Sequence, residues 1–60
     1  MTLQEYIDSY LTKEKQKKRD YINASEKNLT SLENDRNLIN VKTLDISHNN
    51  LISLKGIEKI

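Results

Sequence analysis

The stretch TLDISHNNLISLKGIEKI, residues 43–60, combines two different apolar spacings. Leu44 and Ile46 are two residues apart, which is the side-chain period of a strand. Leu54 and Ile57 are three residues apart, which suits a tight helical turn or an extended three-residue winding. We therefore expect a short strand, a bend at the Asn pair between the two patterns, and a return in a different conformation.

An earlier stretch has the same pattern at a constant offset of 22 residues, so that residues 22–38 align with residues 44–60. The apolar matches are Ile22 with Leu44, Ala24 with Ile46, Leu29 with Leu51, Leu32 with Leu54 and Leu38 with Ile60. Repetition at this length is typical of a solenoid, in which each unit buries its apolar edge only against its neighbours.

The second unit, VKTLDISHNNLISLKGIEKI at residues 41–60, resembles a leucine-rich repeat. It is similar to the 22-residue subclass found in bacterial internalins and in a regulatory subunit of protein phosphatase 1. The resemblance implies an α/β solenoid, a leucine-rich repeat fold with an N-terminal helical cap and about two repeats, lacking a C-terminal cap. Residues 20–40 form the degenerate repeat, and residues 41–60 form the well-matched but incomplete one.

The resemblance also assigns a structural role to Asn49. In the family, the Asn at this position bonds backbone groups of the turn and of neighbouring coils, which the sheet leaves unsatisfied. The degenerate repeat has Lys27 at the equivalent position. A Lys side chain has hydrogen-bond donors but no acceptor, so it cannot both donate to backbone carbonyls and accept from backbone N–H groups as Asn does.

Residues 1–19 are predicted to form an amphipathic cap helix with a basic C-terminal end. Thr2 and Glu5 have the spacing of a capping box, which starts a helix. The apolar residues that follow recur on one helical face, and they are Leu3, Tyr6, Ile7, Tyr10 and Leu11. We expect this face to cover the first coil, with the two Tyr residues packing rather than stacking on a ligand.

Five cations follow this apolar face and are candidates for contact with phosphate: Lys13, Lys15, Lys17, Lys18 and Arg19. The alternative is a solvated helix end, where the macrodipole favours positive charge. Glu14 and Asp20 interrupt the run, and no Gly or aromatic residue is interleaved with it, so the alternative is preferred.

Composition excludes several classes of function. The chain of 60 residues has no Cys and one His, so it offers neither a thiol nucleophile nor enough imidazoles for a metal site, and no cofactor is expected. A net charge of +1 gives no global attraction to nucleic acid or to an acidic membrane. Neither a signal peptide nor a membrane span is recognisable, which predicts a cytoplasmic or nuclear protein that is not secreted.

These observations predict a noncatalytic protein–protein interaction module, the N-terminal part of a longer array or one completed by a partner. The concave-face candidates are Tyr21, Asn23, Ser25, Lys42, Thr43, Asp45, Ser47 and His48. A protein partner would use this face or the open edge expected after Ile60, with no small-molecule substrate. The alternative is a small structural subunit of a ribonucleoprotein or other large assembly, with the basic helix end on RNA.

Overall fold

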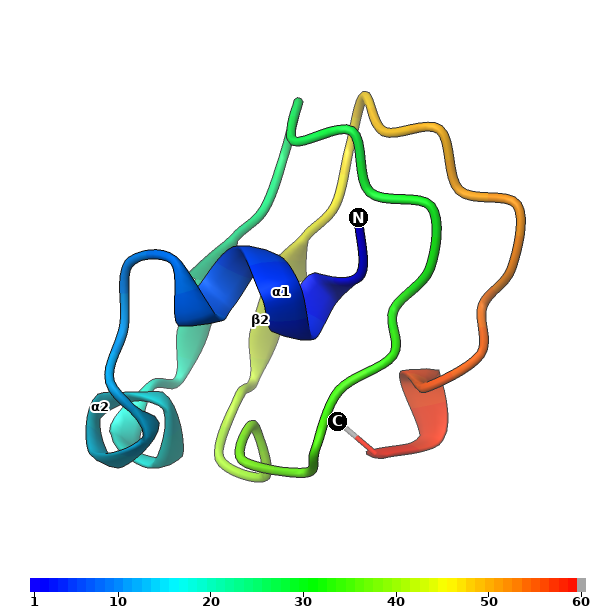
Figure 1. Cartoon of the computed structure of the whole chain (residues 1–60). Coiled ribbons are helices and arrows are strands. Elements are labelled where there is room, and N and C mark those ends of the chain that lie inside the picture. Colours follow the sequence, from blue (N-terminus) through cyan, green and yellow to red (C-terminus); the bar gives the residue numbers. More distant parts are fainter. Residues whose placement is uncertain (60) are drawn as a thin grey trace.

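The computed structural model describes residues 1–59. The elements in chain order are α1 (Leu3–Asp8), α2 (Lys13–Lys18), β1 (Tyr21–Asn23), β2 (Thr43–Asp45) and the short 3₁₀ helix η1 (Ile57–Lys59). The two strands lie side by side, and after each strand the chain turns and runs back (Figure 1). We call residues 20–40 the first segment and residues 41–59 the second segment.

Helix α1 begins where the capping box predicts. The Thr2 hydroxyl accepts a hydrogen bond from the Glu5 backbone N–H at 3.1 Å, and the Glu5 carboxylate accepts from the Thr2 N–H at 2.8 Å. The helix ends at Asp8, however, and α2 starts with its own N-cap, Thr12, which accepts from the Lys15 N–H at 3.2 Å. The predicted single helix over residues 1–19 is therefore two short helices joined by a turn.

Strands β1 and β2 pair in parallel, with Tyr21 opposite Thr43, Ile22 opposite Leu44 and Asn23 opposite Asp45. The pairing continues past the strands, because the Glu26 N–H donates to the Ser47 carbonyl at 3.0 Å. Side chains of successive strand residues point to opposite faces. Ile22 and Leu44 therefore point inward between two outward-facing pairs.

The core is formed mainly by the N-terminal part of the chain. Its fully buried apolar residues are Leu3, Ile7, Ile22, Ala24, Leu29, Leu32 and Leu38. The second segment contributes side chains that are only partly buried, namely Val41, Leu44, Ile46 and Leu51. Helix α1 thus contributes two buried residues to the same core as the first segment.

The predicted α/β solenoid, a leucine-rich repeat fold with a helical cap and about two repeats, is wrong. Residues 1–59 form a small compact body with two short helices and one two-stranded parallel sheet, and they contain no solenoid. The principal extents are 28 × 22 × 17 Å, without the elongation of a stack of units. The physical reason is that Leu3 and Ile7 belong to one shared core. In a solenoid they would instead cover the end of a stack in which each repeat packs only against its neighbours.

Candidate binding surface

The outward-facing strand residues form one continuous polar surface. Tyr21 lies beside Thr43, and Asn23 lies beside Asp45, as the strand register requires. Tyr21, Asn23 and Thr43 are exposed and Asp45 is partly exposed. The structure therefore brings together four of the residues that the sequence predicts for partner binding.

The two predicted serines hold the chain at the ends of the strands. The Asn23 side-chain oxygen accepts from the Ser25 N–H at 3.1 Å and from its hydroxyl at 2.8 Å. Asp45 accepts the same two bonds from Ser47, at 3.1 and 2.8 Å. The bond from the Ser47 backbone is the main reason that the pKa of Asp45 lies below its ordinary value. These polar groups form matching turns after the two strands.

Lys42 and His48 are exposed residues flanking β2. The Lys42 backbone N–H donates to the Asp20 carbonyl at 2.7 Å, at the start of the strand pairing. His48 has a φ of 57° and Glu26 has a φ of 55°, so both residues occupy the left-handed region at the end of a strand. His48 is therefore a turn residue whose side chain lies at the margin of the surface.

A surface hollow of about 340 Å³ lies next to β1 and α1. Its lining residues are Tyr6, Tyr10, Arg19, Tyr21, Asn23, Ser25, Glu26 and Lys27. Tyr21, Asn23 and Ser25 belong to the predicted partner-binding set, and Arg19 belongs to the predicted phosphate-contact set. The predicted residues of the second segment lie outside this lining. We call these eight residues the tyrosine hollow.

Two tyrosines of α1 and its following turn form one wall of the tyrosine hollow. The ring centroids of Tyr6 and Tyr10 are 5.0 Å apart with an interplanar angle of 39°. The Lys27 ammonium lies 5.6 Å from the Tyr6 ring centroid, and the Tyr6 hydroxyl donates to the Asn23 carbonyl at 3.1 Å. Burial raises the pKa of Tyr10, Tyr6 adds to the increase, and the nearby Arg19 opposes it.

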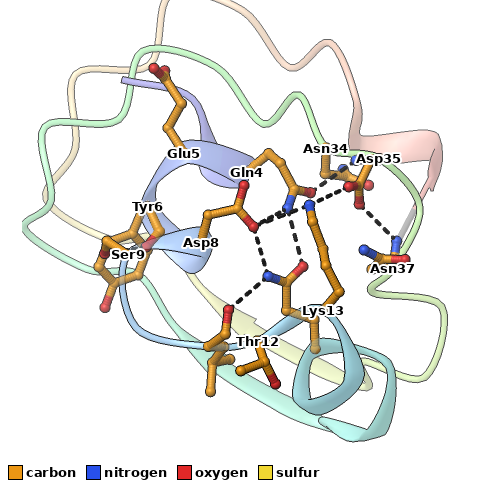
Figure 2. A network of polar contacts seen from close by, with 12 residues as sticks. Gln4, Glu5, Tyr6, Asp8, Ser9, Thr12, Lys13, Asn34, Asp35 and Asn37 are labelled. Carbon is orange, nitrogen blue, oxygen red and sulfur yellow. Dashed lines mark hydrogen bonds and ion pairs between the residues drawn. The ribbon is translucent and has the colours of Figure 1, made fainter.

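The predicted phosphate-contact residues divide into two groups. Lys13 pairs with Asp8 at 3.1 Å and also with Asp35, whose hydrogen bond raises the pKa of Lys13 (Figure 2). Lys18 pairs with Glu14 at 3.4 Å. Of the five predicted cations, Lys15, Lys17 and Arg19 have no ion pair within residues 1–59. Lys13 therefore has a structural role, and the basic run is less available to phosphate than the sequence suggests.

The network around Lys13 includes a buried Gln16, whose role the sequence did not indicate. Gln16 is fully buried in α2 and donates to Asp8 at 2.8 Å and to the Leu11 carbonyl at 3.1 Å. Gln4 donates to Asp8 at 2.9 Å, and it also accepts from the Asp35 N–H at 2.9 Å (Figure 2). This network fixes α2 against α1, and so positions the chain that leads to Arg19.

Asn49, the predicted turn residue, lies between the two segments. Its side-chain oxygen accepts from the N–H groups of Lys27 and Leu29, at 2.9 and 3.1 Å. Its amide nitrogen donates to the carbonyls of Ala24 and Ile46, at 2.8 and 2.9 Å. One side chain therefore satisfies backbone groups of both segments.

A second linking residue, Asn34, was missed from the sequence. It is buried, and its amide nitrogen donates to the carbonyls of Leu32 at 2.9 Å and Gly56 at 3.1 Å. Gly56 has a φ of 101°, and a Cβ atom there would clash with the Leu32 carbonyl oxygen. Asn34 and Gly56 are 22 residues apart, as paired strand residues are. This offset is the only feature of the sequence that could have indicated the contact.

No protein-family model, curated protein or solved structure matches the chain. The resemblance to leucine-rich repeat proteins therefore stays a prediction from the residues alone. In the part of the chain that the structure describes, no three His, Cys, Asp or Glu residues cluster as metal ligands would. None of the helices in that part has the length and apolar character needed to cross a bilayer.

Proposed function

We propose that this protein is a noncatalytic module that binds a segment of another protein. The binding surface consists of the tyrosine hollow and the adjoining outward faces of β1 and β2. The single observation that carries the proposal is the hollow itself, in which three Tyr side chains and Arg19 gather beside an exposed strand. Tyr and Arg are the residue types enriched in protein interfaces, because they combine apolar area with hydrogen-bonding groups.

The polar groups of this surface favour recognition over chemistry. The side-chain oxygens of Asn23 and Asp45 accept bonds from their neighbouring serines, and the Tyr6 hydroxyl donates to a carbonyl. Such groups hold the surface in one shape, which reduces the entropy lost on binding. A catalytic base would instead have to be free to take a proton from a bound substrate, whereas the acceptor oxygens of Asn23 and Asp45 are engaged with serines.

A second candidate is a small structural subunit of a ribonucleoprotein. Lys15, Lys17 and Arg19 favour it, because they carry no ion pair among the described residues and Arg19 also lines the tyrosine hollow. Binding to RNA phosphates would weaken steeply with added salt, because counterions are released on association. Binding of a protein segment to the tyrosine hollow would depend less steeply on salt.

The test is to select binding peptides from a displayed random library with the whole chain as the target. The amide chemical shifts of the protein are then measured with and without each selected peptide. We expect the shifts to fall on Tyr21, Asn23 and Thr43, and we expect Tyr21→Ala to abolish selection. The control is Ile52→Ala, which removes an exposed apolar side chain outside the proposed surface. Peptides that bind the Tyr21→Ala variant with the same affinity as the parent chain would contradict the proposal.

A further inference from the structure

We propose that the tyrosine hollow recognises an acidic, extended protein segment, with a carboxylate of that segment bound by Arg19 and Lys27. This inference rests on the proposed function and names the chemistry of its partner. The hollow is lined by two cations and one carboxylate, that of Glu26, so its own charge is complementary to an anionic ligand.

The two cations lie beside the aromatic pair. The Lys27 ammonium lies 5.6 Å from the Tyr6 ring centroid, and Arg19 lines the hollow together with Tyr10, whose pKa it lowers against the larger effect of burial. Neither cation has an ion pair within residues 1–59. Both can therefore donate charge-assisted hydrogen bonds to a ligand without first breaking an internal ion pair.

The remaining lining groups add neutral donors. The amide nitrogen of Asn23 has no hydrogen bond among the described residues, since Asn23 uses its oxygen for Ser25. The hydroxyl groups of Tyr10 and Tyr21 belong to side chains that are 42% and 46% exposed. A carboxylate accepts hydrogen bonds and donates none when ionised, so it matches a lining rich in donors.

The state of the aromatic rings favours a peptide over single-stranded RNA. Bases bind to such surfaces by stacking on free aromatic faces. Here the Tyr6 ring packs against Tyr10 and also has Lys27 over it. The rings of Tyr6 and Tyr10 are therefore engaged within the protein, and the donors at their edges are the groups left for a ligand.

The experiment is a fluorescence-anisotropy titration of the whole chain with three labelled probes. They are an octapeptide with four Glu residues, the same peptide with Gln at those positions, and an eight-nucleotide oligouridine. We expect the Glu peptide to bind and the Gln peptide to bind at least about tenfold more weakly, which is the effect of losing charge-assisted bonds. The double variant Arg19→Gln, Lys27→Gln should weaken Glu-peptide binding by about the same factor.

The matched control is the double variant Lys15→Gln, Lys55→Gln, which removes two exposed positive charges outside the hollow. It should bind the Glu peptide as the parent chain does, apart from a small general charge effect. Circular dichroism melts of both double variants test whether the fold is retained. If the Arg19→Gln, Lys27→Gln variant has a lower melting temperature than the parent chain, it is replaced by Arg19→Lys with Lys27→Gln.

Equal binding of the Glu and Gln peptides would overturn the acidic-segment inference, while the library selection would still support a protein-binding surface. Tighter binding of oligouridine than of the Glu peptide would overturn both and favour the ribonucleoprotein candidate. Absence of Glu-peptide binding at millimolar concentration would also overturn the inference, and the outcome of the library selection would then decide the proposed function separately.

Discussion

The first and second segments have the same apolar pattern and very different burial. Ile22, Leu29 and Leu32 are fully buried in the first segment. Their counterparts in the second segment are less well covered, because Leu44 and Leu51 are partly exposed and Leu54 is 62% exposed. An apolar pattern therefore selects a conformation, whereas burial depends on which residues pack against it.

Helix α1 supplies the cover for the first segment. Its residues Leu3 and Ile7 are fully buried, and backbone bonds join the helix start to the return of the first segment. The Leu3 N–H donates to the Ser31 carbonyl at 3.1 Å, and the Gln4 N–H donates to the Glu33 carbonyl at 3.0 Å. Within residues 1–59, the second segment has no element on its outer edge, since β2 pairs with β1 alone.

The first prediction tests the difference in burial directly. Leu29→Ala should lower the free energy of unfolding by about 3 kcal/mol, because it opens a cavity in the closed core. Leu51→Ala should lower it by about 1 kcal/mol, because part of that side chain is already in water. Urea denaturation measures both values, with an osmolyte added if the chain is only marginally stable. Equal losses would show that the two segments are equally covered.

The second prediction concerns the link between the segments. Asn49→Ala should lower the free energy of unfolding by about 2 kcal/mol, because it leaves backbone donors and acceptors of both segments without partners. Asn50→Ala is the control, because that side chain is exposed and should change stability by less than about 0.5 kcal/mol. Similar melting temperatures for the two variants would remove Asn49 from this role.

A smaller effect is expected at the contact between Gly56 and the first segment. Gly56→Ala places a Cβ against the Leu32 carbonyl and requires a positive φ, so it should destabilise by about 1 to 2 kcal/mol. The exposed Ser53→Ala provides the comparison. Amide chemical shifts should change at Leu32 and Asn34 in the Gly56 variant, and a variant without such changes would show that the close contact is absent.

The smallest effect is a dependence on pH. Hydrogen bonds, above all that from Gln16, hold the pKa of Asp8 below its ordinary value of 3.8. A lowered pKa means that the bonded carboxylate stabilises the fold above pH 3.8, and that this contribution is lost as the pH falls through the folded-state value. Thermal melts should therefore be flat near neutrality and fall below about pH 4.

The variants Asp8→Asn and Asp45→Asn divide this pH dependence between the two sides of the molecule. The Asp8 variant should show the shallower acid transition, because Asp8 joins α1 to α2 and pairs with Lys13. Asp45 is held mainly by the local turn of Ser47, so its substitution should change the acid transition less. The reverse order would place the acid-sensitive contact in the second segment.

The sequence predicted the local features whose causes are local. The capping box located the start of α1, and the matched apolar pattern aligned Ile22 with Leu44, which the sheet pairs. The solenoid was wrong because nothing in the pattern states whether α1 closes a stack or joins a single core. The break between the helices was missed, although Thr12 is a good N-cap, because the apolar stripe runs through to Leu11.

The candidate surface was only partly predictable. Alternation along the strands identified Tyr21, Asn23, Thr43 and Asp45 as outward-facing. The tyrosine hollow was not foreseen, because Tyr6 and Lys27 meet only after the chain has folded. The role of Gln16 was hidden for the same reason, since a polar residue in a charged run gives no sign that it is buried.

The most direct test of the difference between the segments is native-state amide hydrogen exchange. The Ala24 N–H donates to the Asp45 carbonyl at 2.7 Å, and the Leu29 N–H donates to Asn49. Thr43 and Asp45 direct their backbone groups to β1, so those of Leu44 and Ile46, which alternate with them, point to the outer edge. We predict strong protection at Ala24 and Leu29 and fast exchange at Leu44 and Ile46. Equal protection at all four amides would show that the second segment is covered as the first is, and that the burial of the two segments does not differ.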